Sequence, residues 1–344
     1  MVATRSRGRG TSATTTALHH THAPPPLPTR TLALNWLQIL VAPLPALLVA
    51  WAWARTGTAP PPFTAANALL GGSLALAWVA SLLQGSTWLI DPYWVFIVTP
   101  CLDRFYAAAC AGVSPASPRA SLISGLTALW GCRLQHSYFR RERWRPGARE
   151  DWRYADMRAR LPSLAWAAAS AVVVYALQQG LLVGLALPHY ASRCVVGVAG
   201  VPLALWGADG VGVAAAQAGL ARAKAADDQR VAYGAAPTKP AVLDAGVWAW
   251  SRHPNYVGET LFWWGLSSLA AVRGSGGGRG GSAGRHHWWV LAGAAANTAC
   301  LVGVTLMTEA RTARKPGRAA AWADYCARVP CWVGWRRRKA GGRR

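Results

Sequence analysis

The chain has 344 residues, of which 53% are hydrophobic, and 20 of them are tryptophans. Lysine and arginine number 36 against 13 acidic residues, which gives a formal net charge of +23. Apolar runs of about 20 residues recur, and this is the length that a helix needs to cross a bilayer. These properties exclude a soluble globular domain and predict an all-α, polytopic membrane protein embedded in the lipid bilayer.

The apolar runs predict seven or eight transmembrane helices. The third and fourth runs are short or polar at one end, which leaves the count open between seven and eight. Pro43 and Pro45 predict a kink in the first helix, and the tryptophans fit interfacial belts. The predicted spans are residues 32–54, 63–84, 86–101, 120–136, 162–187, 194–220, 255–272 and 287–308.

The regions outside these spans set the domain limits. Residues 1–31 are rich in Arg, Ser, Thr, His and Pro without an acid, which is typical of a plastid or mitochondrial transit peptide and equally of a disordered tail. We expect one helical membrane domain over residues 32–335, with a C-terminal core from about residue 120, and a basic tail over residues 336–344. Residues 273–284, nearly all Gly, Ser and Arg, predict an unstructured connector.

Basic residues gather in three segments, 140–160, 222–239 and 311–344. Two predicted spans separate each segment from the next, so all three can lie on one side of the membrane. The positive-inside rule makes that side cytoplasmic or its organellar equivalent. This distribution explains the net charge, so no nucleic-acid partner is expected. The host membrane, endoplasmic reticulum or an organellar membrane of plastid or mitochondrion, is not distinguished by the sequence.

The seven cysteines contain no CxxC pair, and most lie in apolar segments. This pattern favours buried free thiols over a disulfide or a metal site. We therefore expect no bound metal. The cysteines occupy positions 101, 110, 132, 194, 300, 326 and 331.

Four acidic residues fall at membrane depth or at its edge, where an ionisable group is costly. Each has two interpretations, a functional group or a structural partner of an arginine. Pro92 directly follows one of them and predicts a helix break, which a membrane protein tolerates where the break lines a protein cavity. The four acids are Asp91, Asp209, Glu259 and Glu309.

The stretch Ser-Arg-His-Pro-Asn-Tyr-Val-Gly-Glu, residues 251–259, runs into an apolar segment. Pro254 suits the first turn of a helix, and Tyr256 and Glu259 share a helix face because they are three residues apart. Such a set at the bilayer edge can hold phosphate and move protons. The alternative is that Arg252 and His253 only anchor the helix among the lipid headgroups.

The segment 137–161 carries eight arginines and four acids. It is either a solvated basic loop or part of a pocket for a polyanionic cofactor, since arginine forks match phosphate and aromatic rings stack on a nucleotide base. The chain has neither a GxGxxG after a strand nor a GxxxxGK[ST] motif. A nucleotide would therefore have to bind between the helices and these segments.

The motif Trp248-x-x-Ser251-Arg-His-Pro-Asn-Tyr-x-Gly-Glu259, followed by Trp263-Trp264-Gly265, resembles the signature of the membrane family built on the steroid 5-alpha-reductase C-terminal domain. It is most similar to a largely uncharacterised branch of that family. Three further motifs of the chain resemble motifs of the same branch. The resemblance covers about residues 86–335. The three motifs are Trp130-Gly-x-Arg133-Leu134 with Glu150-Asp-Trp-Arg-Tyr154, Ala226-Asp-Asp-Gln229, and Glu309-x-Arg311 with Asp324-Tyr325.

The chain also departs from the family pattern. Ala223 stands where an acid is expected, and residues 329–334, Val-Pro-Cys-Trp-Val-Gly, are unusual. The N-terminal Glu and Tyr pair that contacts the enone in true steroid reductases is not located. A steroid is therefore not assigned as the substrate.

The resemblance implies an all-helical membrane fold that holds NADPH with its C-terminal helices. It also implies reduction of an activated carbon–carbon double bond in a hydrophobic, lipid-like or steroid-like substrate. The weak candidates for a catalytic role are Tyr256, Glu259 and Asp91. By matching position, the residues implied to contact or frame the cofactor are Asp227, Arg252, His253, Asn255, Tyr256, Glu259 and Tyr325.

Two alternatives remain at this stage. Isoprenylcysteine methyltransferases carry a similar RHPxY block, so a lipid methyltransferase that uses S-adenosylmethionine is the second hypothesis. S-adenosylmethionine has no phosphate, and the arginine content of residues 140–160 favours the phosphate-bearing cofactor. A non-enzymatic membrane scaffold of the same fold is the third.

Overall fold

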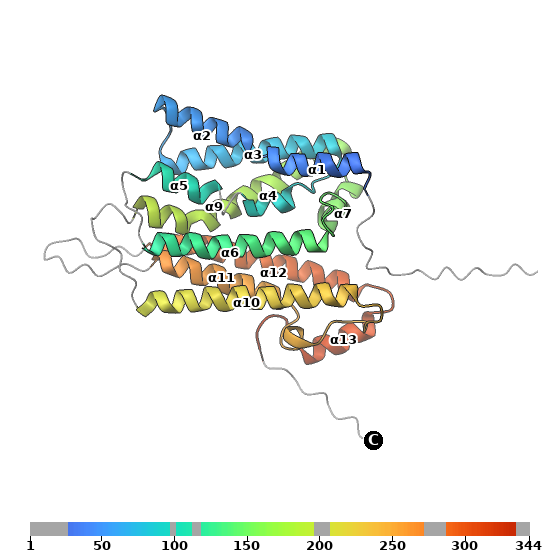
Figure 1. Ribbon diagram of the computed structural model, residues 1–344. Coiled ribbons are helices and arrows are strands. Elements are labelled where there is room, and N and C mark those ends of the chain that lie inside the picture. The colour runs from blue at the N-terminus through green and yellow to red at the C-terminus, as the bar shows by residue number, and fades with distance from the viewer. Residues whose placement is uncertain (1–26, 97–100, 112–117, 196–206, 272–286, 335–344) are drawn as a thin grey trace, which may run out of the picture.

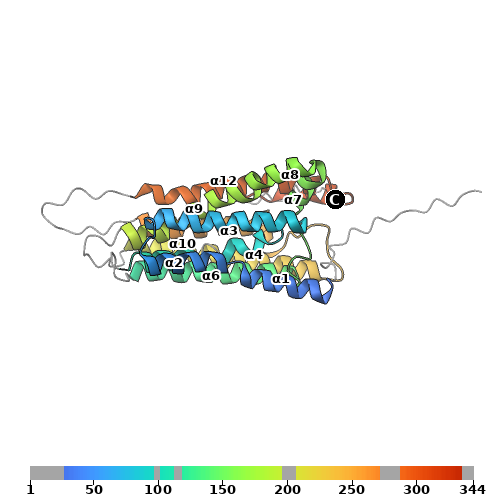
Figure 2. The same cartoon turned by 90° about the horizontal axis from the view of Figure 1, so that it is seen from above.

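A computed structural model describes residues 27–96, 101–111, 118–195, 207–271 and 287–334. Within these ranges every regular element is helical and no strand occurs, which confirms the all-α prediction. The long helices lie side by side in an elongated bundle (Figures 1 and 2). The connector 273–284, the basic tail 336–344 and most of the predicted N-terminal tail lie outside the described residues.

The N-terminal part follows the predicted pattern closely. Helix α1 (Thr29–Val41) and helix α2 (Leu44–Thr56) are separated at Ala42 and Pro43, so the predicted kink in the first span is confirmed. Helix α3 (Pro62–Gln84) begins with a proline at its first position, where no N–H is needed, and ends at Gly85 in the left-handed conformation. Its buried face includes Ala66, Leu70 and Leu74.

The third predicted span, residues 86–101, starts later than predicted, because residues 86–89 are not helical and the helix begins at Ile90. Helix α4 (Ile90–Phe96) and helix α5 (Asp103–Ala109) are short. The prediction that Pro92 breaks a helix is wrong, because Pro92 lies in the first turn of α4. A proline is tolerated there, since the first N–H groups of a helix have no partner within the helix.

The middle of the chain supplies one long helix and one interrupted one. Helix α6 (Pro118–Arg141) is longer than the predicted span 120–136, and helix α7 (Trp152–Arg160) follows it, capped by the Asp151 carboxylate, which accepts from the Arg153 N–H. Helices α8 (Ser163–Ser170) and α9 (Leu177–Tyr190) continue through the π-helical turns Ala171–Ala176 and Ala191–Val195.

The C-terminal part contains the remaining long helices. The helix predicted to end at residue 220 ends later, because helix α10 (Gly207–Ala235) continues through the polar residues 221–235, whose alanines have high helix propensity. Helix α11 (Pro254–Ala271) starts at Pro254 as predicted. The 3₁₀ turn Gly246–Ala249 precedes α11, and the 3₁₀ turn Trp288–Leu291 follows it. The last two elements are helix α12 (Ala292–Ala313) and helix α13 (Ala319–Arg328).

Small residues bring α10 and α11 into close contact. A Cβ atom added to Gly258 would lie 2.6 Å from the carbonyl oxygen of Gly219, and one added to Gly265 would lie 2.6 Å from the backbone nitrogen of Ala216. Neither position leaves room for a side chain. The two glycines of the sequence motif therefore serve the packing of α11 on α10, as small residues do between membrane helices.

Four helical segments in the described part of the chain are long and apolar enough to cross a membrane, which supports an integral membrane protein but leaves seven or eight crossings unconfirmed. The ends of α6, α10 and α12 lie together with α7 and α13 at one end of the bundle (Figure 1). The described residues of the three basic segments are therefore on the same side. The four segments are Thr29–Thr56, Pro62–Gln84, Ser163–Val195 and Trp288–Ala313.

The expectation of buried free thiols is wrong for several cysteines. Cys110 and Cys194 form a disulfide across 84 positions, which ties the end of α5 to the π-helical turn after α9. Cys132 and Cys300 are free but exposed on their helices. The pairing was not visible in the sequence, since neither spacing nor composition identifies a partner 84 positions away.

Candidate functional site

The motif around Arg252 docks onto the C-terminal segment. The backbone N–H of Arg252 donates to the Pro330 carbonyl at 3.0 Å, and the Ser251 hydroxyl donates to the Cys331 carbonyl at 3.3 Å. The phenol of Tyr325, which is buried in α13, donates to the Trp248 carbonyl at 2.7 Å. These contacts fix residues 325–331 against the start of α11.

The Arg252 side chain completes this docking. Its guanidinium contacts both oxygens of Glu309, at 2.8 Å and 3.1 Å, and donates to the carbonyls of Cys326 and Val329. Burial opposes the charge of Arg252, but the hydrogen bonds and attraction of Glu309 outweigh it and raise the Arg252 pKa. All three guanidinium nitrogens are therefore engaged within the protein.

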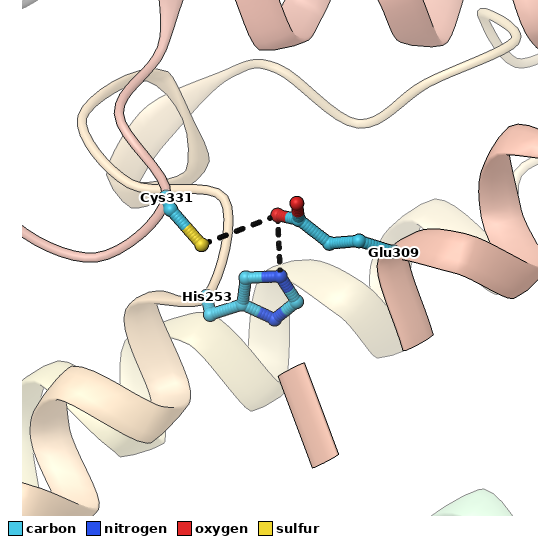
Figure 3. A group of neighbouring side chains, drawn as sticks. All are labelled: His253, Glu309 and Cys331. Atoms are coloured by element: carbon cyan, nitrogen blue, oxygen red, sulfur yellow. Dashed lines mark hydrogen bonds and ion pairs between the residues drawn. The ribbon is translucent and has the colours of Figure 1, made fainter. Parts of the chain in front are cut away.

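His253 and Tyr256 lie beside this ion pair. The Nε2 atom of His253 is 3.0 Å from Oε1 of Glu309, and the imidazole stacks on the Tyr256 ring with centroids 5.3 Å apart. The thiol of Cys331 lies 3.3 Å from the same glutamate oxygen (Figure 3). Asn255 is half-buried in the first turn of α11. The predicted residues Arg252, His253 and Tyr256 are thus brought together.

Asp227 and Glu259 belong to a second group, centred on Arg133 of α6. Arg133 Nη1 contacts Asp227 at 2.9 Å, and Nη2 contacts one oxygen of Glu259. The indole N–H of Trp130 donates to the other Glu259 oxygen at 2.7 Å, and Ser137 donates to Asp227 at 3.0 Å. Arg133 belongs to the Trp130-Gly-x-Arg133-Leu134 motif, but only the packing of α6, α10 and α11 reveals its partners.

The two remaining acids that were predicted at membrane depth are Asp209 and Asp91. Asp209 pairs with Arg119 at 2.6 Å in a nearly fully buried contact near the start of α10. Asp91 lies 3.9 Å from the nearest arginine nitrogen, on Arg141. Three of the four predicted acids, Asp209, Glu259 and Glu309, therefore face an arginine directly. Asp91 lies apart from both groups around α11.

A cluster of cations lies near the end of α12, and we call it the cation cluster. The guanidinium of Arg311 stands 4.1 Å above the ring of Trp152, which begins α7. Burial lowers the pKa of Lys315, and three nearby arginines lower it further. In the described ranges no carboxylate contacts any member of the cluster. Its members are Arg230, Arg311, Lys315 and Arg318.

The cation cluster adjoins the motif residues. Arg311 lies two residues after Glu309, and Arg153, next to Trp152, is within electrostatic range of Tyr256. Trp152 and Arg311 belong to separate sequence motifs, and their contact is not predictable from either motif. Such an arrangement, an aromatic face beside positive charges without acidic partners, can bind an anion that also carries a ring.

The family comparison gives one match. A family model described as a protein of unknown function (DUF1295) matches residues 77–329. No curated protein and no solved structure matches the chain. The matched residues include Arg133, Arg252, their carboxylate partners and the cation cluster, and they end two residues before Cys331.

Proposed function

The chain belongs to the DUF1295 family, which includes steroid 5-alpha-reductase-like proteins, and we propose that it is a membrane-embedded NADPH-dependent reductase. The proposed substrate is a hydrophobic, lipid-like or steroid-like molecule with a carbon–carbon double bond conjugated to a carbonyl. Such a substrate enters from the bilayer, whereas the charged cofactor enters from water at the end of the bundle that carries α7 and α13.

The observation that carries the proposal is the cation cluster beside Trp152. Arginine and lysine side chains without acidic partners favour a ligand with several negative charges, and the Trp152 face suits a nucleotide base. NADPH carries a pyrophosphate and a further phosphate, whereas S-adenosylmethionine carries none. The cation cluster therefore favours NADPH over the methyl donor.

The proposed reaction transfers a hydride from the nicotinamide ring to the β-carbon of the alkene and a proton to the α-carbon. Tyr256 is our candidate for the proton donor, since its phenol belongs to the half-buried first turn of α11. Glu259 is less suited to this role, because Arg133 and Trp130 already engage both of its oxygens.

We further propose that α6, α10 and α11 also cross the bilayer. Together with the four apolar segments and one further passage through α4 and α5, which leads from the Thr87–Glu150 contact beside α7 to the Cys110–Cys194 disulfide, they would give eight crossings. The three helices run along the same direction as the apolar ones (Figure 1). Their polar side chains, such as Arg133 and Glu259, pair with one another inside the bundle, and this pairing reduces the cost of placing them in a membrane.

Thermal denaturation of the detergent-purified chain tests the cofactor assignment. Because a ligand that binds the folded state raises apparent stability, we expect NADPH to raise Tm more than NADH, and S-adenosylmethionine to leave it unchanged. We expect the NADPH shift to fall in Arg311→Gln and to persist in Arg160→Gln. Arg160 is a matched control, since it is an exposed arginine of α7 that pairs with Asp156.

The other outcomes separate the alternatives. A stabilisation by S-adenosylmethionine alone would assign the methyltransferase function. No shift with any of the three ligands would favour a non-enzymatic scaffold. If NADPH stabilises the chain and the Arg311→Gln variant equally, the cofactor lies elsewhere than in the cation cluster.

A further inference from the structure

Three side chains from distant segments place a nitrogen, an oxygen and a sulfur atom together (Figure 3). His253 precedes α11, Glu309 lies in α12, and Cys331 follows α13. Oε1 of Glu309 is 3.0 Å from Nε2 of His253 and 3.3 Å from Sγ of Cys331. All three donor atoms lie within 4.8 Å of one another.

Imidazole, carboxylate and thiolate are the side chains that bind zinc in proteins. With metal bonds of about 2.0–2.3 Å in a tetrahedral site, neighbouring donor atoms lie roughly 3.3–3.8 Å apart. The observed separations approach this spacing, so small side-chain movements would suffice. We propose that His253, Glu309 and Cys331 bind a zinc-like divalent cation through three protein ligands, with a fourth position open.

The backbone around the three donors holds them in place. The backbone N–H of His253 donates to the Ser251 hydroxyl at 3.1 Å, and that hydroxyl donates to the Cys331 carbonyl. The N–H of Arg252 bonds the Pro330 carbonyl, one residue before the thiol. These contacts fix the histidine and the cysteine relative to each other before any metal arrives.

Arg252 contacts the same carboxylate, including the Oε1 atom that faces His253 and Cys331. A ligating carboxylate is usually hydrogen-bonded by a second group that orients it, and Arg252 contacts both Glu309 oxygens. Its charge lowers the affinity for a cation, whereas the ionised Cys331 and Glu309 together neutralise a divalent ion. The Glu309 carboxylate is therefore held in one orientation, and Cys331 supplies the second negative charge that neutralises a divalent cation.

The position in the bundle supports a metal over a disulfide. Cys331 lies at the end that carries the basic segments, which the positive-inside rule assigns to the cytoplasm. Thiols stay reduced in the cytoplasm and disulfides are rare there. A cytoplasmic cysteine beside a histidine is therefore better suited to metal binding than to disulfide formation. The metal would join three segments and hold the C-terminal segment on α11 and α12. This inference does not depend on the proposed reductase activity.

A cobalt titration tests the site. The full chain, purified in detergent and freed of metal by a chelator, is titrated with Co²⁺. We expect a thiolate-to-cobalt charge-transfer band and the visible bands of tetrahedral cobalt, and we expect Zn²⁺ to bleach both. Cys331→Ser should lose the charge-transfer band. Cys326→Ser, which removes a thiol five residues earlier, should retain it.

A second measurement uses the unaltered chain. Bound Zn²⁺ should protect Cys331 from alkylation, as read by peptide mass spectrometry, and leave Cys326 reactive. Zn²⁺ should also raise Tm in the wild type and in Cys326→Ser but not in Cys331→Ser. The proposal is overturned by a missing charge-transfer band, by a band that survives in Cys331→Ser, or by equal alkylation with and without Zn²⁺.

Discussion

The guanidinium of Arg252 contacts both carboxylate oxygens of Glu309, a residue 57 positions later in the chain. The same guanidinium donates to two carbonyls of residues 326 and 329. The sequence motif suggested that Arg252 holds a cofactor phosphate. In the structure its hydrogen-bonding groups hold the C-terminal segment, so we expect its replacement to affect folding first.

We predict that Arg252→Ala destabilises the folded chain by about 1.5–3 kcal/mol, the range for hydrogen bonds to a charged group. Glu309→Gln should also destabilise it, because Arg252 then loses its ionic partner. The double variant Arg252→Ala/Glu309→Gln should lose less free energy of unfolding than the sum of the two single variants, since it leaves no unpaired charge. Chemical denaturation of the four proteins measures this coupling. Strict additivity would show that the pair is not coupled.

The second prediction concerns Glu259, which shares Arg133 with Asp227. Glu259→Gln removes one negative charge from a buried group while nearly preserving shape. We expect a lower Tm, with NADPH affinity per folded molecule retained, because the carboxylate oxygens face Arg133 and Trp130. Melting and binding curves on the same preparation check this. Unchanged Tm with lost NADPH binding would instead place Glu259 in the cofactor site.

The third prediction concerns the contact of α10 with α11. A Cβ atom on Gly258 would meet backbone atoms of Gly219 and Ala223, which cannot move independently. We expect Gly258→Ala to destabilise the chain by about 1–3 kcal/mol, the usual cost of overpacking. Gly303→Ala in α12 is the control, because nothing lies within 4 Å of its added Cβ. It should be neutral or stabilising, since alanine favours helix over glycine. Equal Tm shifts in both variants would contradict the packing argument.

The elements that the sequence predicted well are those with a local signal. Apolar length placed α3 and α12 within a few residues, and Pro254 marked the start of α11. The end of α10 was missed because its polar residues after 220 no longer resemble a span, although alanine-rich sequence keeps them helical to Ala235. The start of the third span was predicted too early, since Trp88 and Leu89 continue the apolar pattern of α4 although they lie in the turn before it.

The partners of the candidate residues were less predictable. Glu259 and Arg133 are 126 positions apart, and nothing in either neighbourhood identifies the other. The same holds for the contact of Arg311 with Trp152, which depends on how α12 ends beside α7. The sequence identified polar residues that needed an explanation. Only the packing of the helices decides which of them neutralise each other and which retain charge without an acidic partner.

The fourth prediction concerns topology. The Cys110–Cys194 disulfide follows helix α5. Helix α5 lies toward the opposite end of the bundle from α7 and α13 (Figure 1). Disulfides persist in oxidising compartments, so we expect this end to face away from the cytoplasm. In sealed vesicles, a membrane-impermeant maleimide should label Ala148→Cys and Gly280→Cys from opposite sides. Labelling of both from one side would contradict this orientation.

The same disulfide makes a stability prediction. It closes a loop of 84 positions, for which the chain-entropy model gives about 4.5 kcal/mol. The double variant Cys110→Ser/Cys194→Ser should therefore melt at a lower temperature than the oxidised chain. Reduced wild-type protein should melt close to the double variant. A reductant that leaves the wild-type Tm unchanged would show that the bond contributes little.

The last prediction concerns pH and Lys315, which lies just after α12. Burial, then Arg318, Arg311 and Arg230, lower its pKa in the folded chain. Between that lowered pKa and the unfolded value of about 10.4, the unfolded chain binds more protons, so stability rises with pH. Below the lowered pKa both states are charged and the full destabilisation remains. We therefore expect Lys315→Met to raise Tm at neutral pH, and the gain to shrink as pH approaches about 10.5.

Two comparisons make this test specific. Lys239→Met removes a lysine that lies over the Tyr233 ring and is not among the groups that lower the pKa of Lys315, and it should not give a gain that shrinks with pH. If the cation cluster binds phosphate, Lys315→Met should also weaken NADPH binding, so stability and affinity change in opposite directions. A Tm difference that stays constant between neutral and alkaline pH would contradict the pKa argument. A normal NADPH affinity would remove Lys315 from the cofactor site, because a phosphate bound among these cations requires the charge that the substitution deletes.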